Sequence, residues 1–406
     1  MSTILIETSE EDSTLAVAEL VSQYLDGGKD KTALAETPGS KFLTACSGLL
    51  AEARFPELLE LFLGNVEPIF SKASGKDLEC CLLVICNMLP KLPAEAQVAA
   101  VLRTSSAFTA AASANSNKDS CLMALVELYN ATFDGRARYT VFVQILKFAR
   151  ESSLLDEVIP IVKGKAAVFI ADWKLPKDDA RTLYLEIAAV LPPADREAFD
   201  LHVTYLKSFE GCSGTELASA QAVAAQTVAD FIKSPDMFKC DIYDLAAVKQ
   251  LESLPSHVGV YQLLSIMLAG DLTALAAFVK EHASVLSDCG ITAEDATMKT
   301  RLMAVLGLGS KGSGLTEISF ETVRDTLAIA DDEVEQWIVM AIGKKLIEAK
   351  IDQLERSIQI TRSTKQVFGA AQWKELQGQL AAWKLNLGNV AALVANAQVQ
   401  AASMTG

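Results

Sequence analysis

The chain has 406 residues, of which 50% are apolar, and its 51 acidic residues outnumber its 36 lysines and arginines to give a formal net charge of −15. This length predicts two or three domains, or a repeat array, with a large apolar core. The negative charge argues against a protein that wraps nucleic acid or lies on an anionic membrane surface.

The first 40 residues are rich in charged side chains and contain Gly27-Gly28 and Thr37-Pro38-Gly39, so we expect residues 1–40 to be a loosely ordered acidic segment. They lack the basic and apolar regions of a signal peptide, and no part of the chain has the roughly 18 successive apolar residues of a membrane helix. The eight cysteines form no Cys-x-x-Cys pair and lie mostly in apolar helical segments. These features predict a cytoplasmic protein whose cysteines are buried thiols.

Residues 41–308 contain a succession of amphipathic helical segments and almost no strand-like alternation. Short polar, Pro or Gly connections between the segments imply antiparallel neighbours, so we expect a mainly α fold built as a right-handed helical-repeat (solenoid) array. Residues 309–316, which include Gly-Ser-Lys-Gly-Ser-Gly, predict a flexible linker after the array. The clearest helical segments are Arg138–Arg150, Asp178–Leu191, Glu216–Lys233, His257–Ala269 and Leu272–Lys280.

Residues 317–368 have the pattern of a winged-helix subdomain. An apolar-polar alternation leads into a segment of helical spacing, Asp331-Asp332-Glu333 supplies the start of a second helix, and the period then changes to two. The expected elements are a strand at Ile318–Phe320, helices at Glu321–Ile329 and Val334–Ile342, and hairpin strands at Ile347–Gln353 and Ser357–Arg362.

A winged helix raises the question of nucleic-acid binding. The helix that would enter a major groove begins Asp331-Asp332-Glu333-Val334-Glu335, and its four acids would repel phosphates. We therefore interpret the subdomain as a protein-contact module. The hairpin carries more basic than acidic side chains, and we favour a solvated basic face over an RNA site. The residues that would make a weak RNA contact are Lys350, Arg356, Arg362 and Lys365.

Residues 370–398 predict one long helix with a narrow apolar seam. Its large apolar residues are spaced 3, 4, 3, 4, 3, 4, which is the a/d pattern of a helix that packs against other helices. The seam could fold back on its own domain, but two tryptophans favour a bundle with helices of a partner. The seam residues are Trp373, Leu376, Leu380, Trp383, Leu387, Val390 and Val394.

The chain shows no pattern for catalysis, a cofactor or a metal. Gly307-Leu308-Gly309-Ser310-Lys311-Gly312 matches G-x-G-x-x-G, but it leaves a helix and enters a linker, whereas a dinucleotide site needs a strand before it. The three histidines, His202, His257 and His282, lie too far apart in sequence for a zinc-hydrolase motif. We therefore expect a protein that is not an enzyme.

Several short segments resemble the PCI-domain family, whose members are scaffold subunits of the proteasome lid, the signalosome and eukaryotic translation initiation factor 3. The resemblance runs from about residue 136 to 390, is densest after residue 317, and is greatest to an initiation-factor subunit. The segments that carry it are Arg138-Tyr139-Thr140-Val141, Asp172-Trp173, Ile318-Ser319-Phe320-Glu321-Thr322, Lys350-Ile351-Asp352-Gln353, Phe368-Gly369, Gln372-Trp373 and Trp383-Lys384-x-Asn386-Leu387.

The resemblance implies a non-catalytic scaffold subunit of eukaryotic translation initiation factor 3, a complex that binds the small ribosomal subunit and helps to recruit mRNA. The terminal helix would enter a bundle with sister PCI and MPN subunits, including the F and H subunits, and the hairpin strands would be edge strands that pair with a neighbouring winged helix. No cofactor, small-molecule substrate, DNA or membrane is implied. Two alternatives stay open: a PCI subunit of the signalosome or proteasome lid, and a winged-helix RNA-binding protein that uses the basic wing.

Overall fold

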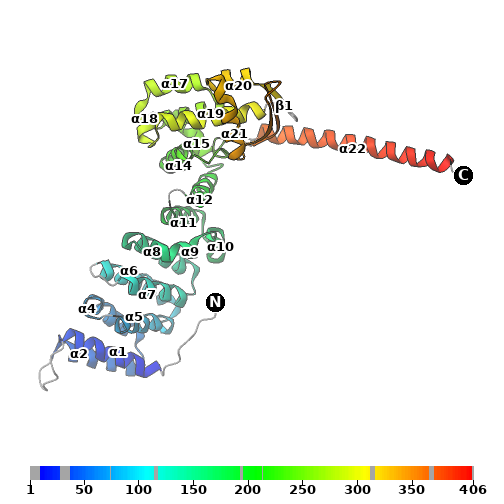
Figure 1. Ribbon diagram of the computed structural model, residues 1–406. Coiled ribbons are helices and arrows are strands. Elements are labelled where there is room, and N and C mark those ends of the chain that lie inside the picture. Colours follow the sequence, from blue (N-terminus) through cyan, green and yellow to red (C-terminus); the bar gives the residue numbers. More distant parts are fainter. Residues whose placement is uncertain are drawn as a thin grey trace. The chain divides into compact units, whose positions relative to one another are not determined.

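The computed structural model describes residues 10–27, 37–73, 75–113, 118–192, 195–212, 214–310, 316–364 and 370–404, and the chain divides into two compact units, Met1–Leu201 and His202–Gly406. The first unit is built from short helices in sequence (Figure 1). They are α1 (Glu10–Leu25), α2 (Pro38–Ala51), α3 (Phe55–Leu63), α4 (Val66–Lys72), α5 (Lys76–Met88), the 3-10 turn η1 (Leu89–Lys91), α6 (Ala94–Ser113), α7 (Lys118–Ala131), α8 (Gly135–Ser152), α9 (Leu155–Val162), α10 (Ala166–Trp173) and α11 (Lys177–Val190), while α12 (Arg196–Lys207) contains the boundary between the units.

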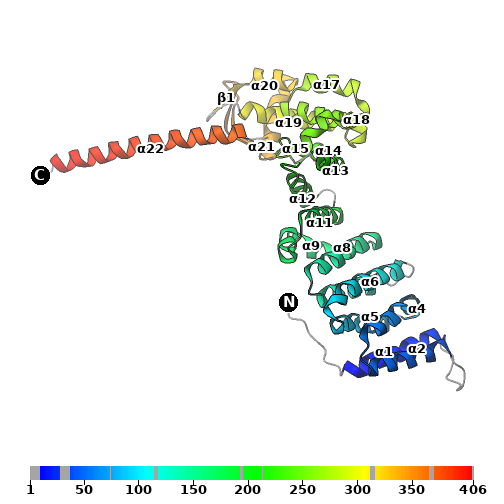
Figure 2. The ribbon, with the colours of Figure 1, turned by 180° about the vertical axis from the view of Figure 1, so that it is seen from behind.

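Each helix of the first unit covers the apolar face of its neighbours. Helix α1 packs on α2, α5 on α7, and α6 on both α7 and α8, so that the helices stack one after another (Figure 2). Polar side chains cap the N-termini of α2 and α8. The Thr37 hydroxyl accepts a hydrogen bond from the Ser40 N–H at 3.1 Å, and the Asp134 carboxylate accepts one from the Ala137 N–H at 2.8 Å. The stacked helices confirm the predicted helical array.

An aromatic cluster joins three helices of the first unit. Trp173, at the end of α10, is buried, and its ring contacts four other rings at centroid distances of 5.1 to 6.4 Å. A Cβ atom at Gly135 would lie 2.9 Å from the Trp173 carbonyl oxygen, so the glycine lets α8 begin directly against α10. The four rings around Trp173 are those of Tyr129 in α7, Tyr139 and Phe142 in α8, and Phe169 in α10.

The prediction of loose order for residues 1–40 does not hold for α1. This helix buries Val17, Ala18 and Val21 in the core of the first unit, because its apolar residues recur at helical spacing and meet α2, α4 and α5. The many charges of the segment concealed that pattern. Residues 1–9 and 28–36 lie outside the described residues.

The second unit begins with further helices and ends in a small sheet and a long helix. The predicted single helix at Glu216–Lys233 is wrong, because the chain breaks at the buried residue Ala220 into two helices. The elements before the sheet are α13 (Gly214–Ser219), α14 (Gln221–Lys233), α15 (Ala246–Lys249), η2 (Gln250–Ser253), α16 (Val258–Ala269), α17 (Leu272–Glu281), α18 (Ala283–Asp288) and α19 (Ala293–Ser310).

The winged helix forms in the predicted order of elements. Ser319 ends the first strand and caps the next helix, since its hydroxyl accepts a hydrogen bond from the Thr322 N–H at 3.3 Å. Ala328, with φ of 47°, ends that helix in a left-handed turn. The elements are β1 (Thr316–Ser319), α20 (Phe320–Leu327), η3 (Asp331–Glu333), α21 (Val334–Gly343), β2 (Ile347–Asp352) and β3 (Ser357–Ser363), and α22 (Ala370–Met404) follows (Figure 1).

The sheet corrects one prediction about its edges. The strand order is β1-β3-β2 with antiparallel pairing, so that Ile358 lies opposite both Ile318 and Ile351. Strand β3, which covers the predicted Ser357–Arg362, is therefore the central strand and has no free edge. The pattern of one hairpin could not show this, because β1 joins from 40 residues earlier in the chain. Strands β1 and β2 form the edges.

The predicted linker begins later than residue 309, because α19 continues to Ser310. A Cβ atom at Gly309 would lie 2.9 Å from the Ser363 Cβ, and the Ser363 hydroxyl donates a hydrogen bond to the Leu306 carbonyl at 3.2 Å. Gly309 thus serves close packing of α19 on β3 instead of flexibility. Residues 311–315 lie outside the described part of the chain.

We predict that Trp173→Ala destabilises the first unit by about 3–5 kcal/mol, because the truncation leaves a cavity among four aromatic rings. Urea unfolding monitored by far-UV circular dichroism would measure the change. Val168→Ala, at an exposed position on the same helix, is the control and should change the free energy of unfolding by less than about 0.5 kcal/mol. A change of similar small size in both variants would contradict the assigned role of the cluster.

Candidate protein-interaction site

The predicted seam lies on α22, which is one continuous helix of 35 residues (Figure 1). The large side chains of the seam are exposed: Trp383 is 65% and Leu387 70% accessible, and Leu376 is intermediate. An exposed apolar stripe of this length is unfavourable in water, which makes α22 a candidate contact surface. The other seam residues whose side chains are exposed are Trp373, Leu380, Val390 and Val394.

The second half of α22 is uncharged on every side. The only charged residues of the helix are Lys374, Glu375 and Lys384, and none follows between residues 385 and 404. Leu385 and Leu393, which lie off the seam, are also exposed. Because a helix that stays in water is usually lined with charged and polar pairs, a long uncharged helix is typical of one enclosed by other helices.

The edge strand β2 presents charged side chains outward. Glu348, Lys350 and Asp352 are exposed, whereas Ile347 is buried, as expected for a strand with one face on the core. The pairing of β2 with β3 shifts between Glu348 and Ala349, which marks a bulge.

Arg356, one of the residues predicted for weak RNA contact, is held by its own subdomain. Its guanidinium pairs with the Asp331 carboxylate at the start of the acidic helix and lies 5.7 Å from the centre of the Phe320 ring. The ion pair neutralises the positive charge that a phosphate would need.

The other predicted basic residues are not gathered into one cationic surface. The Arg362 guanidinium lies 3.3 Å from the Glu348 carboxylate across the β2–β3 pair, and Lys350 is exposed on β2. Lys365 lies outside the described residues. Of the predicted basic residues that the structure describes, Lys350 is therefore the one that lies outside these two ion pairs.

A buried lysine on α19 connects this helix to the end of α14 in the second unit. Lys299, on α19, is only 5% exposed, and its ammonium donates hydrogen bonds to the Phe231 carbonyl and, at 2.6 Å, to the Ser234 carbonyl. It also lies 4.4 Å from the centre of the Phe231 ring. A cation is favourable at this C-terminal end of α14, where carbonyl groups lack helical partners. Burial nonetheless lowers the pKa of Lys299 to about 7.

Arg301, on the same helix, attaches α20 in a similar way. Its guanidinium donates to the carbonyls of Leu327 at 3.1 Å and Ala328 at 3.2 Å, which end α20, and lies 5.2 Å from the Trp337 ring of α21. These contacts join α19 to both helices of the winged helix. Sequence reasoning did not single out Lys299 or Arg301, although two cations beside the apolar stretch of α19 were a usable signal, since buried cations need partners.

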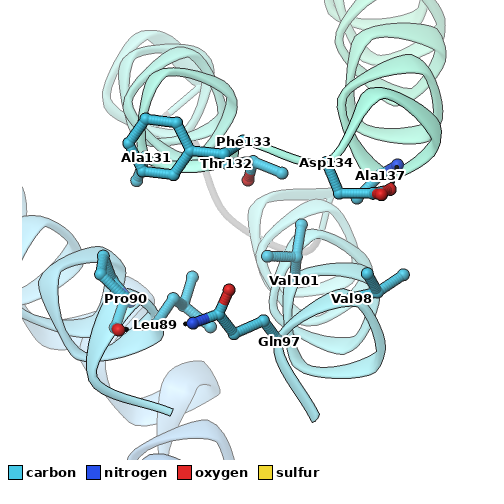
Figure 3. A pocket seen from close by; sticks show the side chains of 10 residues that line it. All are labelled: Leu89, Pro90, Gln97, Val98, Val101, Ala131, Thr132, Phe133, Asp134 and Ala137. Carbon is cyan, nitrogen blue, oxygen red and sulfur yellow. Dashed lines mark hydrogen bonds between the residues drawn. The ribbon is translucent and has the colours of Figure 1, made fainter. Parts of the chain in front are cut away.

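A cavity of about 340 Å³ lies in the first unit, between η1 and α6 on one side and the α7–α8 connection on the other (Figure 3). Phe133 stands at its edge with 83% of its surface exposed. The Gln97 amide donates to the carbonyls of Leu92 and Pro90, and Asp134 caps α8, so its polar side chains already have partners. Its lining residues are Leu89, Pro90, Gln97, Val98, Val101, Ala131, Thr132, Phe133, Asp134 and Ala137.

The eight cysteines all lie in the described part of the chain. All eight cysteines are free thiols; Cys80 is exposed and Cys212 half-buried, and the other six are buried as predicted. Burial raises the pKa of Cys46, Cys81 and Cys121 to about 12, which keeps these thiols protonated. Among the described residues, no three His, Cys, Asp or Glu side chains could hold a metal ion, and none of the helices is long and apolar enough to cross a membrane.

Comparison with known proteins assigns this architecture to a class. The sequence matches the family model of the PCI domain over residues 279–362, from the end of α17 to β3. The match includes α19, in agreement with the contacts of Lys299 and Arg301. Residues 367–392 match the family model described as eIF3 subunit M, C-terminal helix.

The chain is also similar over most of its length to individual known proteins. Eukaryotic translation initiation factor 3 subunit M of Dictyostelium discoideum is 28% identical over 394 residues, which cover 94% of this chain and 96% of that protein. The subunit M proteins of Gallus gallus and Mus musculus are 29% and 28% identical over 62% of this chain, and this chain spans 66% of their length. The chain resembles subunit M of this factor.

We predict that the stability of the second unit depends on pH through Lys299. Between its folded pKa of about 7 and its ordinary value of 10.5, the unfolded chain binds one more proton than the folded chain, so the free energy of unfolding rises with pH. The rise is at most about 1.4 kcal/mol per pH unit, and this stabilisation is lost as the pH falls toward 7. Urea unfolding at pH 7 and pH 9 would measure it.

Lys299→Met should remove this part of the pH dependence, whereas Lys350→Met, at an exposed position, should retain it. The readout is the difference between the two pH values, so an overall loss of stability in the Lys299→Met variant does not affect the comparison. An unchanged pH dependence in that variant would show that Lys299 does not titrate in this range.

Proposed function

We propose that this protein is a non-catalytic scaffold subunit of the eukaryotic translation initiation factor 3 complex and that α22 attaches it to sister subunits. The observation that carries the proposal is the exposed apolar seam of α22, most of which lies in the segment that matches the subunit M helix. Relatives that bear the name of this subunit support the choice of complex.

The energetics support a bundle of helices. Burial of one large apolar side chain contributes roughly 1.5–3 kcal/mol, and α22 exposes at least four such side chains on one seam without counting its tryptophans. A 35-residue helix that carries only three charged residues is poorly solvated, and most helical stability in proteins comes from packing. In the proposal, helices of partner proteins bury the seam that the helix's own unit leaves exposed. In the proposal, these helices come from sister PCI and MPN subunits, including the F and H subunits.

The winged helix is the second proposed contact. Strand β2 is an edge strand whose outward N–H and C=O groups could pair with a strand of a neighbouring PCI subunit, whereas the central position of β3 leaves β1 as the only other edge in the described sheet. Through the assembled complex, the protein would support recruitment of the small ribosomal subunit and mRNA. No catalytic step is assigned to the chain.

We predict that Leu380→Glu, Trp383→Glu and Leu387→Glu together release the protein from its complex, because each substitution places a charge in an apolar contact. Interface anchors of this kind cost about 2–4 kcal/mol each, or about 30-fold or more in affinity. Co-purification of the tagged full-length chain from its own cells, followed by native mass spectrometry, would measure assembly. Glu is chosen because it favours helix formation.

Lys374→Glu is the matched control, because it alters charge at a position of α22 that is already charged. It should leave assembly unchanged, and thermal unfolding of the rest of the chain should be unchanged in both proteins. Full retention of the triple variant in the complex would refute the bundle. Recovery of signalosome or proteasome-lid subunits with the wild-type chain would leave the proposed α22 bundle standing but would overturn the proposed complex.

We also predict that the isolated protein binds single-stranded RNA weakly and with a shallow salt dependence. Because Arg356 and Arg362 are paired with carboxylates, few phosphates can be neutralised, and the slope of log K against log salt should stay below about 1.5. Fluorescence anisotropy with labelled oligouridine between 50 and 300 mM KCl would measure it. A steep slope that Lys350→Ala reduces would favour the RNA-binding alternative.

A further inference from the structure

Leu354 is the most exposed of the large apolar side chains that the structure describes. It stands at the tip of the β2–β3 hairpin with 96% of its surface accessible. Single exposed apolar residues are common on protein surfaces and by themselves need no explanation. The way in which the surrounding turn is held distinguishes this one.

The backbone of the tip is fixed from within. One oxygen of the Asp352 carboxylate accepts hydrogen bonds from the N–H groups of Leu354 at 3.0 Å and Glu355 at 3.1 Å. Such a turn is a stable local structure that does not depend on the Leu354 side chain. The following residue, Arg356, has φ of 51°, a left-handed conformation that few non-glycine residues adopt.

Two further contacts hold the tip against the acidic helix. The Gln353 amide donates to the Glu335 carboxylate at 3.0 and 3.1 Å, and the Arg356 guanidinium pairs with the Asp331 carboxylate. Residues on both sides of Leu354 thus stabilise the turn, while Leu354 contributes almost no burial to its own subdomain. A preorganised turn loses little entropy when it binds, which is the property of an interface anchor.

The surroundings of Leu354 are acidic. The contacts above bring η3 and the start of α21 beside the tip, and within this group of residues the one cation, Arg356, is already paired. Phosphates of nucleic acid or of anionic lipid would be repelled here, whereas a basic protein surface would be attracted. The carboxylates around the tip are those of Asp331, Asp332, Glu333, Glu335, Asp352 and Glu355.

We propose that Leu354 is an anchor that inserts into an apolar pocket rimmed by Lys or Arg side chains on a partner protein. This contact is separate from strand pairing along β2 and from the α22 seam. It rests on the proposed function only in the expectation that the partner is a subunit of the same complex, and the chemistry of the pocket does not depend on which complex that is.

The test places a photocrosslinker beside the anchor and leaves Leu354 in place. p-Benzoylphenylalanine is incorporated at position 355 in the full-length chain in its own cells, and crosslinked peptides are mapped by mass spectrometry. We expect one mapped protein segment that contains apolar and basic residues. The yield should fall at least about 10-fold with Leu354→Glu and change less than about 2-fold with Leu354→Met, in line with burial of one large apolar side chain.

The rim is tested in the same system. Asp332→Lys alters an exposed carboxylate that makes none of the hydrogen bonds that hold the tip, and it should also lower the yield. Thermal unfolding should be unchanged in all three variants, because the altered side chains are exposed.

The outcomes separate the two proposals. A crosslink to an initiation-factor subunit that depends on Leu354 supports both, and one to a subunit of another complex supports the anchor and overturns the proposed complex. Equal yields with Leu354 and with Leu354→Glu, a crosslink to RNA, or no crosslink above an exposed control position such as Glu321 would overturn the anchor.

Discussion

The structure depends on burial of the apolar face of each amphipathic helix. In the first unit, neighbouring helices bury these faces: α5, α6, α7 and α8 pack on one another, and the ring of Trp173 packs between three helices. The seam of α22 has the same chemistry, but its side chains from Leu380 to Val394 are exposed. The hydrophobic effect that stacks the helices of the array therefore also favours burial of the α22 seam, which is why we propose that helices of other chains cover it.

Cations on α19 make the winged helix part of the second unit. Packing alone would leave the carbonyls at the ends of α14 and α20 without helical partners, and Lys299 and Arg301 satisfy them from one helix. The positive charge is stabilised by these carbonyls and opposed by burial, which is the origin of the lowered pKa of Lys299. Through Arg301, these contacts hold both helices of the winged helix against α19.

The local periodicity of the sequence predicted where helices and strands lie better than it predicted which of them pack or pair with one another. The strands and helices of the winged helix and the seam of α22 follow directly from spacings of 2, 3.6 and 3.5, because these patterns describe which face of one segment is apolar. The central position of β3 depends on β1, which is distant in sequence, and the packing role of Gly309 depends on Ser363. In α1, the many charged residues made the helical spacing of its apolar residues difficult to recognise in the sequence. No local pattern could show that Arg356 pairs with Asp331, because that contact requires the folded hairpin to lie against η3.

The charges of the edge strand restrict how it can be used. An exposed edge invites pairing with any other strand, and proteins oppose this with charges and bulges. Strand β2 has both: Glu348, Lys350 and Asp352 alternate in sign along its exposed face, and the bulge lies at its start. Like charges opposite one another destabilise a strand pair, so a strand that pairs with β2 would be disfavoured if it placed acidic side chains opposite Glu348 and Asp352 or a basic one opposite Lys350. The features that protect the edge from unspecific association thereby also restrict which strands can pair with it.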